Sequence, residues 1–278
     1  MTIMYSFSVL SAKKAGKKNQ KPKKKQKKNG QKKSVFKRIC IRLGQLLLVF
    51  FAASILLTVV YRWVNPPVTP LMLIRKATQG ASIQKKWVDI QNLSPYLIEA
   101  AVASEDNFFL AHHGFDFGAI EKAIEERKTK KRFRGASTIS QQTAKNVFLW
   151  SGRSWIRKGL ECYFTVLIEL LWSKERIMEV YLNIIETGNG IYGCEMASEV
   201  YFNKTANKLS RKQAALITAC YPNPRKWNPS KPTTYIQNRA SQIVQLTTLI
   251  GKIQFDKEHI QKAQERYEKY NRKRKKQK

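Results

Sequence analysis

The chain has 278 residues, 43% of them hydrophobic, and a formal net charge of +33. Such an excess of positive charge first suggests nucleic acid or an anionic surface as a partner. Its distribution argues against nucleic acid, because residues 1–42 hold 15 Lys and Arg with no acid and residues 270–278 hold six more. Both tails have too few apolar residues to fold alone, so the charge does not mark a nucleic-acid-binding domain.

An uncharged stretch follows the first basic tail. Leu43–Val60 contains 18 residues, which at ~1.5 Å per helical residue nearly span a hydrocarbon core of roughly 30 Å. Tyr61 and Trp63 follow as in an interfacial belt, and a Pro pair at 66–67 then ends any helix. We predict a transmembrane helix over residues 43–63. A cleaved signal peptide is less favoured because the basic segment is too long, and a soluble buried helix less still.

The charge asymmetry also predicts an orientation. By the positive-inside rule, the basic tail (residues 1–42) stays in the cytoplasm, so the chain after Val60 lies on the other side of the membrane. This outer part divides into a linker, a folded domain and a basic C-terminal extension, over residues 64–85, 86–250 and 251–278.

The outer domain has the pattern of a mainly α fold with few or no strands. Helix starts are predicted at Ser94, which precedes a proline, and at Ser173. Ser210 has Gln213 three residues later, as in a capping box. The stretch 135–150, which opens with Gly, is predicted to be another helix.

Two adjacent acids are the first candidates for chemistry. Glu105 and Asp106 lie near the end of a predicted apolar helix, beside Phe108 and Phe109. A carboxylate against aromatic surface is poorly solvated, which raises its pKa and suits it to proton transfer. An exposed helix end with ordinary acids is an equally good interpretation of this stretch alone.

The pair His112 and His113, with Asp116, raises the question of a metal site. Neighbouring side chains on a helix point about 100° apart, so an adjacent pair rarely shares one metal ion. The cysteines form no CxxC pair, which gives no sign of a zinc site either. Hydrogen bonding that closes the helix end before Gly114 is the better interpretation, and no metal ligands are predicted.

A basic run, Arg127–Arg134, has six Lys and Arg in eight residues. It is either a solvated loop or, on a membrane-tethered domain, a contact for anionic lipid headgroups.

The next helix carries a chemically varied polar face. Gln141 lies one helical turn before Lys145, and Gln142 one turn before Asn146. Plain surface faces favour Glu and Lys, whereas this face offers neutral donors plus one ammonium group. It suits sugars and phosphates.

Cations follow this face. Arg153, Arg157 and Lys158 are close in sequence, and Glu161 shares a helix face with Lys158. A salt-bridged surface helix is the alternative interpretation, although the neighbouring Leu160, Tyr163 and Phe164 are apolar.

Taken together these stretches match a known family. The pattern Glu-Asp-x-x-Phe-x-x-His-x-Gly is met from Glu105 to Gly114, and Gly-x-Ser-Thr-Ile-x-Gln-Gln-x-x-Lys-Asn from Gly135 to Asn146. Arg-Lys-x-x-Glu is met from Arg157 to Glu161, and "SKERIMEVYLN", "GIYGCEMASEVYF" and "PNPRKWNP" follow in order. The chain resembles the peptidoglycan glycosyltransferases (glycosyltransferase family 51), especially the monofunctional biosynthetic peptidoglycan transglycosylases, over about residues 87–232.

The resemblance implies a lysozyme-like, mostly helical domain anchored by one N-terminal transmembrane helix. It places that helix in the inner (cytoplasmic) membrane and the domain in the periplasm or extracytoplasmic space. It implies polymerisation of lipid II, with the nascent lipid-linked glycan chain as donor. The 4-hydroxyl of the acceptor attacks C1 of the donor, the α-linked diphosphate leaves as undecaprenyl diphosphate, and a β-1,4 bond forms with inversion. Membrane lipids and cell-wall synthesis proteins are the other partners that it suggests.

Roles for residues also come from the resemblance. Glu105 would be the general base and Glu161 a second catalytic carboxylate, while Lys145, Arg153 and Lys158 would hold the diphosphate. The remaining substrate-binding candidates are Asp106, Phe109, His112, Ser137, Thr138, Gln141, Gln142, Asn146 and Arg157. No tightly bound cofactor is expected; a divalent cation (Mg or Mn) bridging the substrate diphosphate is compatible with the pattern.

Some features of related proteins are missing from the sequence. Bifunctional relatives carry a transpeptidase domain with a Lys-Thr-Gly motif, and this sequence contains none, so no transpeptidase activity is expected. A lytic transglycosylase or muramidase is a rival interpretation, but it has no use for a cationic cluster at a diphosphate. A non-enzymatic basic envelope protein would spread its bases over the folded part rather than in the tails.

Overall fold

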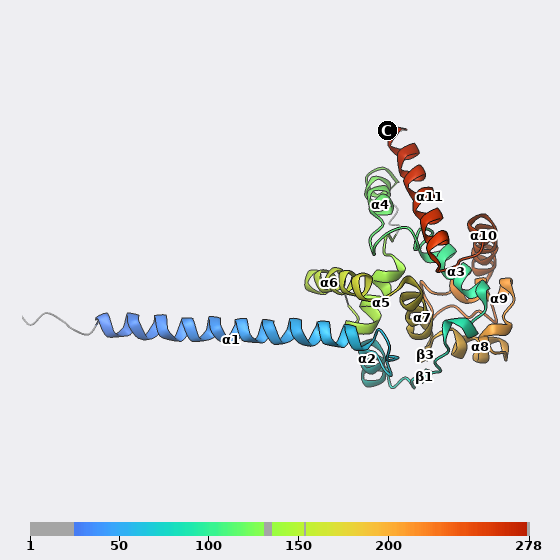
Figure 1. The fold of residues 1–278 in the computed structure, drawn as a ribbon. Coiled ribbons are helices and arrows are strands. Elements are labelled where there is room, and N and C mark those ends of the chain that lie inside the picture. Colours follow the sequence, from blue (N-terminus) through green and yellow to red (C-terminus); the bar gives the residue numbers. More distant parts are fainter. Residues whose placement is uncertain (1–24, 131–134, 153, 277–278) are drawn as a thin grey trace, which may run out of the picture. The chain divides into compact units, whose positions relative to one another are not determined.

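The computed structural model describes residues 25–130, 135–152 and 154–276 (Figure 1). The chain forms two units, Met1–Ala53 and Ser54–Lys278. The described part of the first unit belongs to helix α1 (Lys25–Val60), which also provides the first residues of the second unit. Within α1, the 26 residues Val35–Val60 have a mean hydropathy of 2.4, long and apolar enough to cross a membrane by length and composition. The predicted N-terminal apolar helix is confirmed.

The second unit is built almost entirely of helices. Its α-helices are α2 (Pro70–Gln79), α3 (Pro95–Glu105), α4 (Phe117–Lys130), α5 (Ile139–Phe148), α6 (Trp155–Leu171), α7 (Lys174–Ile184), α8 (Cys194–Phe202), α9 (Arg211–Ala219), α10 (Thr234–Ile250) and α11 (Lys257–Lys276). Two short 3-10 helices, η1 and η2, span Ile90–Asn92 and Ala206–Lys208. The predicted mainly α fold is confirmed.

One small sheet accompanies the helices. It has the order β1-β3-β2, with β1 (Gln84–Lys85) parallel to β3 (Ile191–Tyr192) and β2 (Glu186–Gly188) antiparallel to it. These strands are too short to show an alternating pattern in the sequence, which is why few or no strands were expected.

Local capping chemistry sets several helix starts. Ser173 accepts a hydrogen bond from the backbone of Arg176, and Ser210 forms the predicted capping box with Gln213. The start of α5 differs from prediction, because it begins at Ile139 and not at the glycine four residues earlier. A capping box of Thr138 and Gln141 fixes this start, which leaves the preceding residues outside the helix.

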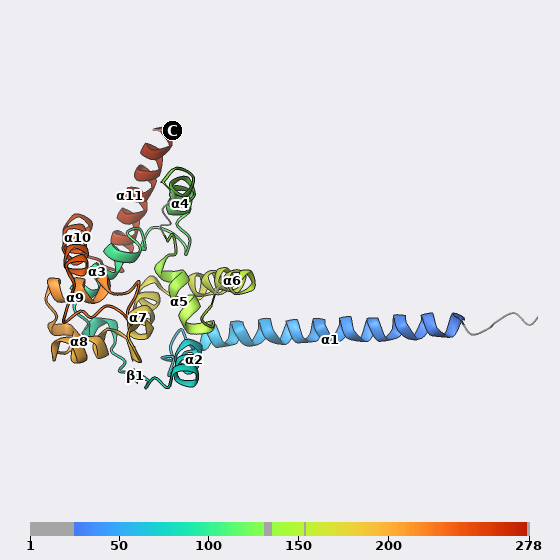
Figure 2. The same cartoon turned by 180° about the vertical axis from the view of Figure 1, so that it is seen from behind.

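The core is divided between two groups of packed helices. Helices α3, α9 and α10 pack together, and α5 packs on α6 and α7, as both views show (Figures 1 and 2). Fully buried side chains in this core include Leu97, Phe109, Ile139, Ile168 and Tyr181. The end of α3 and the start of α5 are thereby held on a rigid base.

Helices α2 and α11 lie in the segments expected to be a linker and a basic extension. Thr69 caps α2, Met72 is fully buried, and Gly80 ends the helix with a left-handed conformation (φ 64°). Helix α11 lies beside α4 in both views (Figures 1 and 2), and Tyr267 donates a hydrogen bond to Asp116 at 2.8 Å.

The last turns of α1 pack within the second unit. Ser54 shares a 2.8 Å hydrogen bond with the hydroxyl of Tyr163, and the Trp172 indole N–H donates to the carbonyl of Thr58 at 2.8 Å. Arg176 then donates to the carbonyl of Tyr61 at 3.0 Å. Residues Ser54 to Tyr61 are therefore part of the folded unit and do not form a free tether.

Candidate active site

Glu105 is the last residue of α3. Asp106 leaves the helix with φ −161°, so the carboxylate of Glu105 projects from a helix end. Its side chain is only 15% exposed. The amide of Gln142 donates to Oε2 of Glu105 at 2.9 Å, and a guanidinium nitrogen of Arg239 lies 3.9 Å from Oε1.

The environment of Glu105 disfavours its charged form. Burial raises the pKa of this carboxyl, while the hydrogen bond from Gln142 and the charge of Arg239 act in the opposite direction. The net pKa shift is upward, as the sequence predicted. The alternative of an ordinary exposed acid is therefore wrong.

Asp106 ties together the elements around Glu105. One carboxylate oxygen shares a 2.9 Å hydrogen bond with Nε2 of His112, and the other accepts from the backbone N–H of Ile139 at 3.0 Å. The carboxylate thus sits on the first turn of α5, where a negative charge is favoured. These bonds place Asp106 and His112 in the scaffold that holds Glu105.

Two further residues of the first motif are built into the scaffold. Phe109 is fully buried, with the ammonium group of Lys174 4.7 Å from its ring centroid. Lys174 also donates to the backbone carbonyl of His112 at 2.6 Å. Gly114 has φ +83°, and its carbonyl accepts a hydrogen bond from Thr138.

The polar residues of α5 separate into two groups. Gln142, Lys145 and Asn146 line one cavity of about 430 Å³. Thr138 and Gln141 are both buried and form the capping box. Thr138 also lines a second cavity, together with the exposed Ser137.

Helix α6 carries a carboxylate held between two cations. Arg157 donates to Oε2 of Glu161 at 2.8 Å, and Lys158 donates to Oε1 at 2.5 Å. The predicted pairing of Lys158 with Glu161 is confirmed. Arg153 lies outside the described residues, as do residues 131–134 of the basic run.

Lys145 completes this cationic group from α5. Burial lowers the pKa of its ammonium group, the carboxylates of Glu161 and Glu105 oppose that effect, and the charges of Arg157 and Lys158 add to it. An anion that enters would stabilise the charged form of this ammonium group. The arrangement suits a phosphate or diphosphate ligand.

Protein ligands for a metal ion do not gather here. Both oxygens of Glu161 already accept hydrogen bonds from cations. Among the described residues, no three of His, Cys, Asp and Glu lie close enough together to hold an ion. A divalent cation would therefore need the substrate's own oxygens as its main ligands.

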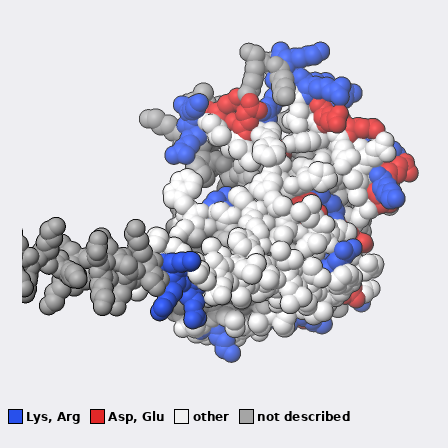
Figure 3. Space-filling view, turned by 60° about the vertical axis from the view of Figure 1, so that its left-hand side comes forward, with Lys and Arg blue, Asp and Glu red and all other residues white. Residues whose placement is uncertain are grey.

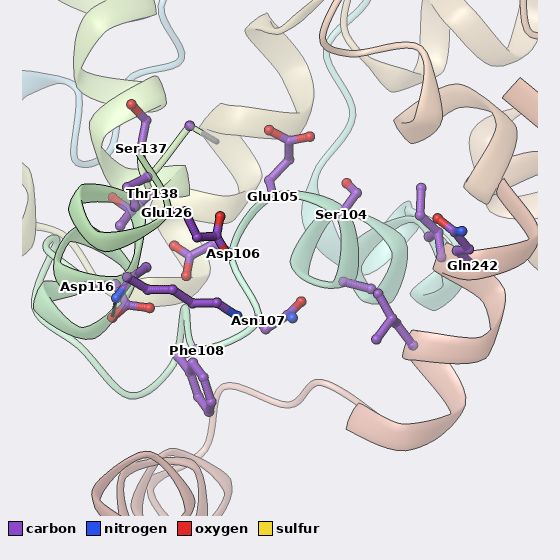
Figure 4. Close-up of a pocket in the computed structure, with 18 of the residues that line it drawn as sticks. Ser104, Glu105, Asp106, Asn107, Phe108, Asp116, Glu126, Ser137, Thr138 and Gln242 are labelled. Carbon is purple, nitrogen blue, oxygen red and sulfur yellow. Dashed lines mark hydrogen bonds between the residues drawn. The ribbon is translucent and has the colours of Figure 1, made fainter. Parts of the chain in front are cut away.

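Glu105 lines the second cavity, of about 310 Å³, together with residues from several elements. Figure 4 shows Glu105 and Ser104 at the end of α3, Ser137 and Thr138 ahead of α5, and Gln242 of α10 around this space. We call this space the Glu105 cavity, and the space lined by Lys145 the Lys145 cavity. Gln142 lines the Lys145 cavity and hydrogen-bonds Glu105, so the two cavities meet at this pair.

Several residues of the site are not among those predicted from the sequence. Tyr181 is fully buried and donates to the carbonyl oxygen of Gln142 at 3.5 Å, an arrangement that directs the amide nitrogen toward Glu105. Arg239 reaches Glu105 from α10. Arg75, Glu186 and Arg225 line the Lys145 cavity from three separate elements. Of these residues, Tyr181 and Arg225 lie in stretches that the sequence motifs include, but no role was predicted for either.

Comparison with known proteins assigns the family. A sequence model described as transglycosylase matches residues 73–248. The chain belongs to the transglycosylase family. The biosynthetic peptidoglycan transglycosylase of Bacteroides thetaiotaomicron is 55% identical over 221 residues, covering 78% of this chain and 89% of that protein.

Other relatives carry the same name. The biosynthetic peptidoglycan transglycosylase of Rhodospirillum centenum is 49% identical over 210 residues, covering 76% of this chain and 91% of the relative. That of Bdellovibrio bacteriovorus is 50% identical over 202 residues, covering 71% and 81%. The predicted family is confirmed, and the protein is a peptidoglycan glycosyltransferase.

Proposed function

We propose that this enzyme polymerises lipid II into β-1,4-linked glycan strands, with inversion at the donor C1 and release of undecaprenyl diphosphate. We propose further that it has no transpeptidase activity. One observation carries the proposal: Glu105, a desolvated carboxylate, lines one cavity and accepts a hydrogen bond from Gln142, which lines a second, strongly cationic cavity.

The Glu105 carboxylate acts as the general base. It accepts the proton of the acceptor 4-hydroxyl as that oxygen attacks the donor C1. A base with a raised pKa is a stronger proton acceptor while ionised, and a positioned base contributes ~10²–10⁴-fold to rate. Gln142 and Arg239 both favour the charged form of Glu105, which is the form that accepts a proton.

The Lys145 cavity receives the diphosphate. Among the described residues that line it, four are cationic (Arg75, Lys145, Arg157 and Arg225) and one is acidic (Glu186). Preorganised cations stabilise the charge that develops on the leaving diphosphate. Lys158 pairs with Glu161, as Arg157 does, and Glu161 orients both cations. Arg153 is proposed for this group from the motif alone.

A divalent cation on the diphosphate stays a prediction. With the substrate as the source of most of its ligands, it would neutralise part of the negative charge on the diphosphate. The roles proposed for Glu105 and the cationic side chains do not require it.

We further propose that α1 anchors the enzyme in the cytoplasmic membrane with its N-terminus inside. Its apolar span supports this, as do exposed apolar side chains on α6. These are Trp155, Ile156, Val166 and Leu170. Figure 3 shows a face of the second unit whose centre carries few charged side chains. Such surfaces suit contact with lipid, which both substrates contain.

The test is glycan synthesis from purified lipid II. We expect Glu105→Gln to lower polymerisation about 10²–10⁴-fold, since the amide cannot accept the proton although it can still accept the Gln142 hydrogen bond. Glu258→Gln, an exposed acid at the start of α11, is the matched control and should polymerise normally. Full activity of Glu105→Gln would remove Glu105 as the base.

The same assay separates synthesis from lysis. If the wild-type enzyme solubilised finished peptidoglycan and made no polymer from lipid II, the lytic interpretation would replace the proposed one. A cross-linking assay with the same product tests the absence of transpeptidase activity.

A further inference from the structure

Helix α11 reaches the Glu105 cavity from outside the segment that the family model matches. The match ends at residue 248, and α11 begins at Lys257. Tyr270 of this helix nevertheless lines the same cavity as Glu105. The sequence around it is dominated by charged residues, so only the folded structure reveals this placement.

Specific contacts hold α11 against the first motif. The ring of Phe108, three residues after Glu105, lies 5.0 Å from the ring of Tyr267 and 5.1 Å from that of Tyr270, measured between centroids. Such aromatic contacts stabilise a packed interface beyond the area that they bury. The helix therefore packs directly on the loop that follows the catalytic carboxylate.

Polar contacts fix the same helix to the start of α4. Tyr267 donates to Asp116 at 2.8 Å, and Asp116 also accepts from the backbone N–H of Ala119. Further along α11, Arg274 donates to the carbonyl of Gly118 at 2.5 Å and pairs with Glu121. Tyr270 lies between these two anchors, so its position in the cavity wall is defined.

The lining of the Glu105 cavity suits a neutral ligand. Among the described residues around it, the acids Glu105, Asp106, Asp116 and Glu126 are accompanied by Lys122 and Arg239. Acids thus outnumber bases in this described lining, in contrast to the cationic Lys145 cavity, so a phosphate is disfavoured here and an uncharged ligand fits better. Between the charges lie amide and hydroxyl groups, from Asn107, Gln242 and Ser137, and the aromatic rings.

A pyranose ring has the matching chemistry. Its hydroxyl and acetamido groups hydrogen-bond to amides and hydroxyls, and its C–H face packs on an aromatic ring. Tyr270 is 40% exposed, so part of its surface is open to such a contact. Pockets that combine aromatic surface with a few placed polar groups are typical of small-molecule sites.

We propose that α11 completes a glycan-binding subsite beside Glu105, in which Tyr270 packs against one sugar ring of the peptidoglycan strand. The role of this subsite in chain elongation rests on the proposed function, whereas glycan binding itself can be measured independently.

The experiment uses the full chain in detergent, with Glu105→Gln introduced to prevent turnover. The ligand is a soluble peptidoglycan tetrasaccharide without lipid or diphosphate, and binding is measured by calorimetry. We expect Tyr270→Ala to weaken binding roughly tenfold, the upper range of one aromatic contact. Tyr270→Phe should retain binding, because the ring remains.

Two further variants test whether a loss of binding comes from a folding defect or from a change of charge on α11. Tyr270→Leu keeps an apolar side chain against Phe108 and should weaken binding as Tyr270→Ala does. Arg272→Ala changes a side chain of the same helix that is 77% exposed and should bind like the parent. Thermal unfolding of each variant reports whether α11 stays in place.

The outcomes separate the subsite from the proposed function. Equal binding by Tyr270→Leu and the parent, or no binding by the parent, would overturn the subsite. If the wild-type enzyme makes no polymer from lipid II yet the tetrasaccharide binds and Tyr270→Leu loses it, the subsite stands and the proposed function fails. In an active enzyme, we expect Tyr270→Leu to shorten the glycan products while Arg272→Ala leaves them unchanged.

Discussion

Glu105 is surrounded by groups with opposing effects on its ionisation. Desolvation at the end of α3 makes the charged form costly, and Gln142 and Arg239 restore part of the lost stabilisation. A general base needs both contributions, because it must be ionised often enough to react and basic enough to accept a proton. Arg239 enters this balance through charge alone, at 3.9 Å.

Arg239 provides a test of this balance. Its positive charge lowers the pKa of Glu105, so Arg239→Met should raise that pKa further. Because the base must be deprotonated, the acidic limb of the kcat/KM profile should move to higher pH, and Arg239→Lys should restore part of the shift. Lipid II polymerisation across a pH series measures this.

Gln245→Met, on an exposed position of the same helix, is the control for that series and should leave the profile in place. A limb that stays fixed in Arg239→Met, or moves to lower pH, would contradict the electrostatic role of Arg239.

At the scale of elements, the turn between α3 and α4 is tightly constrained. Gly114 has φ +83°, and a Cβ there would lie 2.7 Å from Cγ2 of Thr165 and 3.0 Å from Cγ of Glu169. Both the left-handed backbone and the close approach of α6 require glycine. The turn therefore fixes His112 and Asp106 relative to α6.

We expect Gly114→Ala to destabilise the second unit by about 1–3 kcal/mol, because backbone strain and overpacking combine. Gly135→Ala is the matched control, since a Cβ at that position meets no atom within 4 Å and the backbone is not left-handed. Urea unfolding of the two variants in detergent gives the difference. Equal stability of both would contradict the packing of the turn on α6.

The helices whose starts depend on local chemistry are those that the sequence predicts well. Ser173 and Ser210 act through hydrogen bonds to residues three positions on, so the signal lies within one turn. The predicted start of α5 at Gly135 is four residues too early, because the capping box of Thr138 and Gln141 sets the first turn. The sequence predicts only a basic extension where α11 lies, because the residues that hold this helix, Asp116 and Gly118, are far away in sequence.

The candidate site shows the same difference between local motifs and contacts that are distant in sequence. Glu105, Lys145 and Glu161 stand in recognisable motifs; Glu105 and Lys145 each line a cavity, and Glu161 holds Arg157, which lines the cavity of Lys145. Arg239 acts on Glu105 through its charge, and Tyr181 acts through Gln142; both interactions join residues far apart in the sequence, which no local spacing encodes. Sequence motifs thus reveal the groups proposed to contact the substrate. They reveal less well the groups that orient those side chains or shift their pKa.

At the scale of the whole molecule, the end of α1 from Ser54 onward forms a junction with α6 inside the second unit. Trp172 is buried, and its indole N–H satisfies the carbonyl of Thr58. Breaking this contact leaves a buried carbonyl without its donor, which costs about 1–3 kcal/mol. The junction should therefore contribute measurably to stability.

We expect Trp172→Phe to lower the free energy of unfolding by about 1–3 kcal/mol, because the ring is largely replaced but the N–H donor is lost. Trp155→Phe, at a side chain that is 92% exposed, should have little effect. Denaturant unfolding of the full chain in detergent measures both. If the two variants unfold alike, the Thr58 contact does not stabilise the junction.

This junction has a consequence for how the enzyme would meet its substrates. With α1 as the proposed anchor, Ser54 and Thr58 lie in the apolar span, yet their partners Tyr163 and Trp172 belong to the catalytic unit. The catalytic unit itself, through Tyr163 and Trp172, would then contact residues that lie in the hydrocarbon layer, so the unit would stay at the membrane surface. Finding a new lipid-linked monomer becomes a two-dimensional search, with its rate set by lateral diffusion of the monomer in the leaflet.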